Sequence, residues 1–137
     1  MIDRLRRDFS FPPNVDLYDG GTGGMGLLAP IEETDYLIIV DAVLVDEAPG
    51  TIVRMDFESI PSHLRRPVSS HEIDIIDVLK MADILEKRPP TVIIGIQPGD
   101  IATYGTELTI ESHIPELIQR VLDELRALGV EPREKDS

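Results

Sequence analysis

The sequence Asp-Tyr-Leu-Ile-Ile-Val-Asp-Ala-Val at residues 35–43 decides the fold class. Its aliphatic run, residues 37–40, suits a strand buried on both faces, as in a parallel sheet covered by helices on either side. The run stops at Asp41. Open α/β sheets bind ligands in the crevice beyond the carboxyl ends of their strands, so Asp41 is the first functional candidate. The alternative is an aspartate that caps the following turn.

Further strands are predicted on both sides of this stretch. Residues 91–96, Thr-Val-Ile-Ile-Gly-Ile, are nearly all apolar and predict a second interior, parallel strand. Residues 51–57 predict another strand, and the short separation from residues 35–43 favours antiparallel pairing between these two, which would make the sheet mixed. The alternation at residues 15–18 is typical of a short strand.

Helical patterns separate these strands. Apolar residues recur every three or four positions from residue 71 to about 86 and from residue 112 to 128, and both patterns predict amphipathic helices. Residues 1–8 resemble the end of a helix, and residues 27–33 a short one. We therefore expect one α/β domain over residues 1–131, with helices covering a sheet that is mixed, followed by a flexible tail at 132–137.

Composition excludes several classes of function. The 137 residues carry a formal net charge of −13, which disfavours binding to nucleic-acid phosphates or to acidic membrane surfaces. The sequence has no cysteine, so disulfides, thiolate metal sites and cysteine nucleophiles are absent. No apolar run reaches the roughly 20 residues of a membrane span, and no signal peptide is evident at the start. We expect a soluble, cytoplasmic protein.

A glycine-rich loop at residues 21–26 permits a nucleotide-binding interpretation. Gly21, Gly23 and Gly26 match the dinucleotide pattern G-x-G-x-x-G between a predicted strand and a helix, and Asp41 follows about 20 residues later. Against this, the predicted helix is short, and the charge of Asp19 would oppose a pyrophosphate. The phosphate-loop pattern with Gly-Lys-Ser/Thr does not occur.

The sequence has three histidines, of which His71 is the most informative. It lies where a loop becomes a predicted helix, so its side chain can project into the crevice beyond the sheet. An imidazole and a carboxylate from two element ends suit a divalent transition metal, although two ligands do not complete a closed site. The structural alternative is a capping or surface histidine. We assign His63 to the surface and His113 to packing or capping.

Several motifs, in this order and spacing, resemble the nickel-iron hydrogenase maturation proteases over about residues 1–131. They are Asp-Gly-Gly-Thr at 19–22, Leu-Ile-Ile-Val-Asp-Ala-Val at 37–43, Ala-Pro-Gly-Thr at 48–51, Ser-His-Glu at 70–72 and Ile-Ile-Gly-Ile-Gln-Pro at 93–98. The resemblance implies a three-layer αβα sandwich with a twisted, mostly parallel (mixed) sheet. It also implies that the loop of Asp19, Gly20, Gly21, Thr22 and Gly23 faces the substrate and does not cradle a cofactor.

The activity implied by the resemblance is endopeptidase cleavage. Such an enzyme removes a C-terminal extension from the hydrogenase large-subunit precursor, and the nickel that it recognises is supplied by that precursor. The metal-contacting residues of the family that map onto this sequence are Asp41 and His71, while the nucleophile stays unassigned. A nucleotide-binding α/β module and a noncatalytic metal-binding partner of the precursor remain the alternatives.

One part of the family pattern is missing. Family members open with a strand ending in a GxGN-type turn and then carry a first acidic metal ligand, whereas Met1 falls within the helix that should follow. We hypothesise that the sequence is N-terminally incomplete; a natural short variant without activity is the alternative, and the coding sequence upstream of Met1 distinguishes them. The acids Asp19, Asp46, Glu47 and Glu72 are near in sequence but are not assigned as replacement ligands. Glu72 is a candidate to hydrogen-bond a metal-contacting side chain, and the alternative is a solvent-facing acid in the first turn of the helix.

A sheet without this first strand has a predictable defect. Loss of the first strand would expose the hydrogen-bonding edges of the two apolar strands at residues 37–40 and 91–96. Exposed strand edges of this kind pair with other chains. We therefore predict low solubility or oligomerisation for the chain as given, which light scattering and size-exclusion chromatography would detect. A monodisperse monomer that unfolds cooperatively would contradict this prediction.

Overall fold

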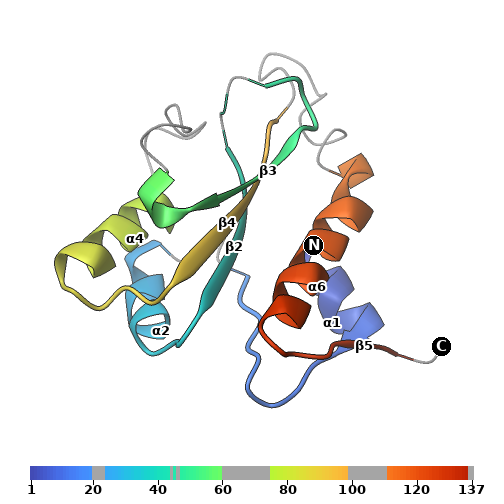
Figure 1. Ribbon diagram of the computed structural model, residues 1–137, viewed down its shortest axis with the longest axis horizontal. Coiled ribbons are helices and arrows are strands. Elements are labelled where there is room, and N and C mark those ends of the chain that lie inside the picture. The colour runs from blue at the N-terminus through green and yellow to red at the C-terminus, as the bar shows by residue number, and fades with distance from the viewer. Residues whose placement is uncertain (20–23, 44, 46, 60–74, 99–110, 136–137) are drawn as a thin grey trace.

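The computed structural model describes residues 1–19, 24–43, 45, 47–59, 75–98 and 111–135. The main elements are the strands β2 (Leu37–Ala42), β3 (Ile52–Asp56) and β4 (Thr91–Ile96) and the helices α1 (Ile2–Asp8), α2 (Leu28–Glu32), α4 (Ile75–Ile84) and α6 (Ile114–Ala127). The strands form one sheet, with α2 and α4 on one face and α1 and α6 on the other (Figure 1). The expected αβα sandwich with a mixed sheet is confirmed.

The centre of the sheet is β4, which lies between β2 and β3. All of its residues are buried, as its apolar sequence predicts. Ile93 packs in the cluster under α4, whereas Ile94 and Ile96 pack in the cluster under α6. Alternate side chains of this one strand thus supply both cores.

The helix α6 buries most of its predicted apolar stripe, whereas α4 buries the predicted stripe only as far as Ala82 and leaves Ile84 and Leu85, which were expected to belong to it, exposed. In α6 the buried residues, Leu117, Ile118, Val121, Leu122 and Leu125, recur at helical spacing. The chain leaves this helix at Gly129, whose φ of +83° is readily adopted by glycine. The described part of the second helix, α4, buries Ile76, Val78, Leu79 and Ala82; the predicted start of this helix, residues 71–74, lies outside the described residues.

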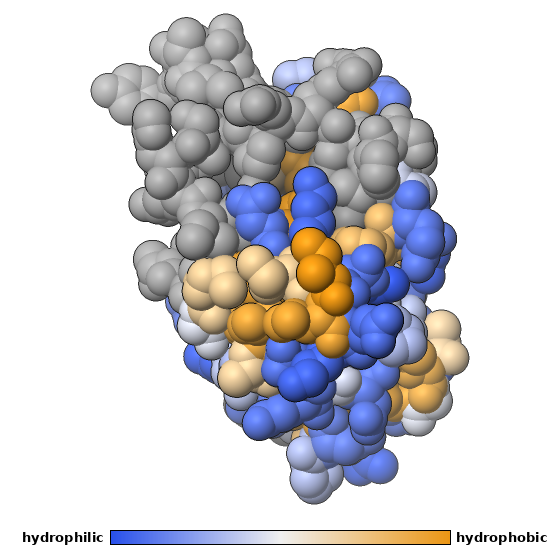
Figure 2. All heavy atoms as spheres, turned by 90° about the vertical axis from the view of Figure 1, so that its left-hand side faces the viewer, coloured by the Kyte–Doolittle hydropathy of each residue, from blue (hydrophilic) through white to orange (hydrophobic). Residues whose placement is uncertain are grey.

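The solvent face of α4 is partly apolar. Met81, Ile84 and Leu85 remain 40%, 74% and 47% exposed, respectively. Figure 2 shows hydrophobic atoms gathered on the side of the molecule that carries α2 and α4, bordered by hydrophilic ones. This surface is larger than single scattered apolar side chains would produce.

The prediction that β2 is buried on both faces was only partly correct. It is parallel to β4, as expected, but only Ile39 is buried within the strand and the other residues are half-buried. Among the described residues β2 has a single strand neighbour, so it forms an edge of the sheet. Burial of an aliphatic run therefore depended on neighbours that the sequence pattern alone does not specify.

The predicted pairing of β2 with β3 was wrong. The third strand, β3, is antiparallel to β4, with Ile52 opposite Ile96 and Asp56 opposite Val92. The connection that follows β2 crosses the end of β4 and begins β3 on its far side. Crossing one strand needs only about 10 Å, which a connection of this length spans easily. The fully buried β4 gains a hydrogen-bonding partner on each edge by this route.

The predicted strand at residues 15–18 does not form. The side chains of this segment nonetheless alternate between the core and solvent. Val15 and Leu17 pack against the cluster under α6, while Asp16 and Tyr18 are exposed. No described strand lies beside this segment to complete a hydrogen-bonded ladder. Instead, the carbonyl of Leu17 accepts a hydrogen bond from Arg6 Nη2 at 2.7 Å.

A small second sheet was not predicted. The strands β1 (Phe9–Ser10) and β5 (Arg133–Glu134) pair antiparallel and join the two ends of the chain. Lys135 extends this contact, since its N–H donates to the carbonyl of Asp8 at 2.8 Å. Both residues of β5 are exposed, and a two-residue ladder carries no sequence signal.

The packing at Gly95 gives a stability prediction. A Cβ atom at this position would collide with Val43 Cγ2 and lie 3.3 Å from Met55 Cε, because β2 and β3 both close onto β4 there. We expect Gly95→Ala to lower the free energy of unfolding by about 1–3 kcal/mol, the usual cost of overpacking a core.

Chemical denaturation would measure this change. The matched control is Gly26→Ala, because Gly26 has no atom within 4 Å of the added carbon. We expect the control to stay within about 0.5 kcal/mol of the parent chain. Equal effects of the two substitutions would contradict the collision at Gly95.

Candidate functional site

The site lies at the boundary of the sheet formed by the carboxyl ends of its parallel strands, where β2 and β4 end together. We call this boundary the carboxyl edge, as distinct from the side of the sheet along β2. Their parallel register pairs Asp41 with Gly95 and Ala42 with Ile96. The last two residues of each strand therefore lie side by side, at the edge where open α/β sheets form their ligand crevices. Asp41 is the carboxylate that β2 delivers to this edge.

The Asp41 side chain lies on the α4 side of the sheet. Alternation along the strand places it on the same face as Ile39 and Val43, which pack in the cluster under α4. Asp41 is half-buried, and its Oδ1 accepts a hydrogen bond from the N–H of Ala42 at 2.9 Å. That bond fixes the carboxylate relative to the peptide that follows it.

The direction of α4 relates this edge to the second predicted ligand. A short connection, residues 85–90, joins the end of α4 to the start of β4, so the helix runs antiparallel to the strand. Its first residue, Ile75, therefore faces the edge that holds Asp41, on the same side of the sheet. His71 precedes this helix in the sequence and lies outside the described residues.

The other predicted site residues are only partly described. Asp19 is exposed, and Gly20, Gly21, Thr22 and Gly23 lie outside the described residues. The same is true of His63, Asp46 and Glu72, whereas Glu47 is described and exposed. Within the part of the chain that the structure describes, no group of three or more His, Cys, Asp or Glu side chains is arranged to hold a metal ion.

The second half of the glycine-rich loop forms a 3₁₀ turn, η1 (Gly24–Leu27), which is followed by α2, a helix of only five residues. A dinucleotide fingerprint instead opens a helix whose N-terminus faces the pyrophosphate. The described residues after the loop therefore give the nucleotide interpretation no support.

His113 has the packing role expected from the sequence. It is the N-cap residue of α6, but its side chain makes no capping hydrogen bond. Its ring lies against the α-carbon of Gly50, where an added Cβ would be 2.6 Å from His113 Cε1. Gly50 has a φ of +89°, so both its backbone conformation and this contact require glycine.

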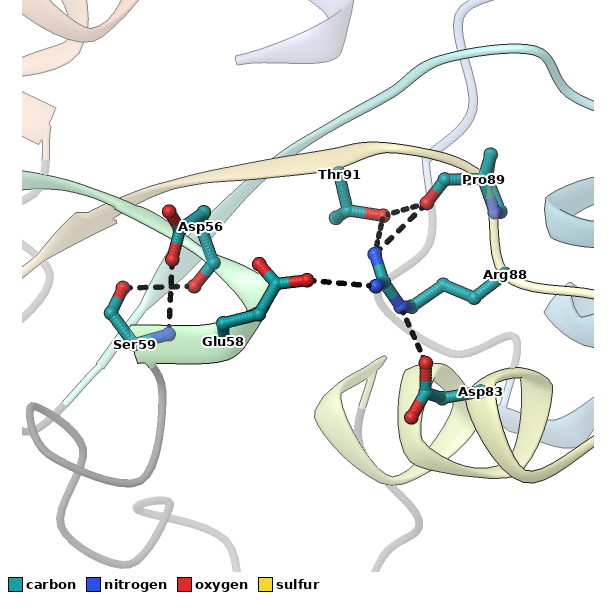
Figure 3. Close-up of polar contacts among 7 residues, drawn as sticks. All are labelled: Asp56, Glu58, Ser59, Asp83, Arg88, Pro89 and Thr91. Carbon is teal, nitrogen blue, oxygen red and sulfur yellow. Dashed lines mark hydrogen bonds and ion pairs between the residues drawn. The ribbon is translucent and has the colours of Figure 1, made fainter. Parts of the chain in front are cut away.

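A polar network around Arg88 joins segments whose contact the sequence did not predict. Arg88 is the residue that follows the turn after α4, and its side chain is only 14% exposed. Its Nε donates to Asp83 Oδ1 at 3.0 Å, and its Nη2 donates to Glu58 Oε1 at 3.2 Å (Figure 3). Asp83 belongs to α4 and Glu58 to the 3₁₀ turn η2 (Phe57–Ser59), so Arg88 joins the elements on either side of residues 60–74.

The same guanidinium also contacts the start of β4. Its Nη1 donates to the carbonyl of Pro89 at 3.0 Å and to Thr91 Oγ1 at 3.4 Å, and its central carbon lies 4.1 Å from the centroid of the Phe57 ring. No pattern in the sequence identifies such a hub, because its partners come from separate segments. The only sequence signal was Pro89-Pro90, which marks the end of the helix.

A local cap fixes the start of η2. Asp56 Oδ1 accepts from the N–H of Ser59 at 3.0 Å, and Ser59 Oγ donates to the Asp56 carbonyl at 3.0 Å (Figure 3). Hydrogen bonding from Ser59 holds the pKa of the Asp56 carboxyl below its usual value. This cap and the Arg88 network together anchor the described residues that lead into segment 60–74.

Comparison with known proteins gives a consistent result. Residues 1–124 match the model of a family described as hydrogenase maturation protease. The hydrogenase 2 maturation protease of Escherichia coli K12 is 32% identical, over 98% of this chain and 85% of that protein. The hydrogenase expression/formation protein HupD of Rhodobacter capsulatus is 34% identical over 95% of this chain, which spans only 64% of HupD.

A solved structure agrees with these relatives. The hydrogenase maturating endopeptidase HybD from E. coli superposes with a TM-score of 0.82 at 30% identity, covering 98% of this chain and 85% of that one. At this level of agreement the chain shares the fold of that endopeptidase over the part of it that the chain covers.

The Arg88 network gives a test of the scaffold around the site. We expect Arg88→Met to lower the free energy of unfolding by about 1–2 kcal/mol, because Thr91 and the Pro89 carbonyl lose a charged donor while Asp83 and Glu58 stay hydrated. Arg88→Lys should recover only part of this loss, since an ammonium group cannot reproduce the planar fork. Thermal and chemical denaturation would measure both.

The control for this test is Arg7→Met. Arg7 pairs with Asp8 on the surface, where its side chain is 70% exposed, so its removal should cause no measurable change. An equal loss in the Arg7 and Arg88 variants would mean that the Arg88 contacts contribute no more than a surface ion pair.

Proposed function

Since this chain belongs to the hydrogenase maturation protease family, we propose that it is the endopeptidase that removes the C-terminal extension of the nickel-loaded hydrogenase large-subunit precursor. The observation that carries this proposal is Asp41, a half-buried carboxylate at the ligand-binding edge of the sheet. The precursor is both the substrate and the partner of the chain.

In this proposal Asp41 and His71 contact the nickel of the substrate. A carboxylate oxygen and an imidazole nitrogen suit a divalent transition metal, and two protein ligands leave positions open for groups of the precursor and for water. The direction of α4 supports this pairing, because the helix begins on the face and edge that carry Asp41. Nickel held there would act as a Lewis acid toward the scissile carbonyl or the attacking water.

We further propose that the loop of Asp19, Gly20, Gly21, Thr22 and Gly23 faces the precursor. Asp19, the described member of this loop, is exposed, as a contact residue must be before the substrate binds. No helix among the described residues is long and apolar enough to cross a membrane.

We place the reaction in the cytoplasm, where thiols are kept reduced and a protein without cysteine is not unusual.

Substitution of the two proposed ligands tests this function. We expect Asp41→Asn and His71→Ala to slow shortening of the nickel-loaded precursor by more than the roughly 10- to 100-fold that loss of a residue hydrogen-bonded to a metal ligand costs. The shortened product would be measured by intact mass, with and without nickel in the precursor. His63→Ala is the matched control and should retain the parent rate.

The outcomes separate the alternatives. A parent chain that binds the nickel-loaded precursor but never shortens it would be a noncatalytic partner. Binding of NAD without binding of nickel would favour the nucleotide-binding module. Cleavage that is unaffected in both Asp41→Asn and His71→Ala would refute the proposed metal contacts while leaving the protease activity intact.

A further inference from the structure

We infer that Gln97 is a positioning residue, which orients the Asp41 carboxylate by holding the loop that follows it. This inference rests on the proposed function insofar as Asp41 contacts the substrate's nickel. The loop in question, residues 43–51, leads from β2 across the end of β4 to β3, and we call it the crossing loop. Gln97 is the first residue after β4, at the point that the crossing loop passes.

Gln97 bonds to both ends of the crossing loop. Its backbone N–H donates to the carbonyl of Thr51 at 2.9 Å, and its carbonyl accepts from the N–H of Gly50 at 2.9 Å. Its side-chain Oε1 accepts from the N–H of Val45 at 2.8 Å. The backbone of Gln97 therefore holds the β3 end of the loop, whereas its side chain holds the β2 end.

The two ends respond differently to a change of side chain. At the β3 end, the bonds to Gly50 and Thr51 involve only main-chain atoms, and the His113 ring packs against Gly50 as well. At the β2 end, the Val45 N–H is bonded to the Gln97 side chain and Val43 N–H to the Ile96 carbonyl at 3.0 Å. A substitution at residue 97 therefore loosens the end next to Asp41 and leaves the other end in place.

The connection from this end to Asp41 is short. Asp41 Oδ1 is bonded to the N–H of Ala42, so the carboxylate follows the orientation of the peptide between residues 41 and 42. That peptide is followed by the last bond of the β2–β4 ladder, at Val43, and then by the anchor at Val45. Without the anchor, the strand end can fray from Val45 back toward Ala42, and the carboxylate turns with it.

The decisive experiment measures backbone order at Asp41 without using nickel. Amide hydrogen exchange by NMR would compare the parent chain with Gln97→Leu, which lacks an acceptor, and Gln97→Glu, which keeps one. A lost hydrogen bond is worth about 1 kcal/mol, so we expect Ala42 and Val45 amides to exchange roughly 5- to 10-fold faster in Gln97→Leu. Gly50 should be unchanged, and Gln97→Glu should restore parent exchange rates.

A matched control comes from α6. Gln119 is exposed and its Nε2 donates to Asp123 Oδ1 at 2.9 Å. The substitution Gln119→Leu therefore removes a glutamine hydrogen bond within α6 and none to the crossing loop. It should leave Ala42 exchange unchanged. Unchanged Ala42 exchange in Gln97→Leu would overturn the inference, because the Gln97 side chain would then not order the peptide after Asp41. Equal acceleration of Ala42 and Gly50 exchange would also overturn it, because the substitution would then destabilise the whole domain.

A second arm examines the consequence for nickel recognition. The kcat and KM for shortening of the nickel-loaded precursor would be measured for the parent chain and for Gln97→Leu, Gln97→Glu and Asp41→Asn. We expect Gln97→Leu to lose roughly 5- to 10-fold in kcat/KM and Gln97→Glu to recover it. If Asp41→Asn has no effect, the proposed metal contact fails while the exchange result still decides the role of Gln97. Normal kcat/KM in Gln97→Leu with Asp41→Asn inactive would refute the positioning role.

Discussion

The backbone of β4 must be hydrogen-bonded along both edges, and the rest of the structure depends on this requirement. Every residue of β4 is buried, and apart from Thr91 its side chains are apolar or absent. Buried N–H and C=O groups without partners are costly, so a strand in this environment needs a neighbour on each side. The parallel β2 provides one and the antiparallel β3 the other. Helices can then pack on both faces because the alternating side chains of β4 point into both cores.

This central position explains the geometry of the site. Because β2 and β4 are parallel and end in register, Asp41 reaches the open edge of the sheet beside Gly95. Because β3 lies beyond β4, the chain must cross the end of β4 directly after Asp41, and Gln97 is the residue it meets there. The absence of a side chain at Gly95 lets Val43 close onto the sheet at the same point. The crossing loop, which carries the chain to β3 on the far side of β4, therefore also holds the Asp41 carboxylate in place.

Similarity to the HybD endopeptidase, with a TM-score of 0.82 at 30% identity, shows that the fold is retained while most side chains change. The apolar strands and the helix stripes tolerate exchange among aliphatic residues, because such exchanges keep volume and patterning. Positions such as Gly50 are less tolerant, since its positive φ and the His113 ring against its α-carbon both exclude a side chain. The motif Ala-Pro-Gly-Thr at 48–51, on which part of the family resemblance depended, contains this constrained glycine.

The sequence by itself determined the fold class, the two parallel strands, the helix stripes and Asp41 as a candidate, because these follow from local periodicity and from the residue at which an apolar run stops. Only the tertiary structure decided that β3 pairs with β4, that β2 lies at an edge of the described sheet, and that residues 15–18 pack without pairing. It alone revealed the contacts of Arg88 and Gln97 with distant segments. Pairing partners and hydrogen bonds between distant segments depend on which surfaces meet after folding, and a linear pattern does not record that.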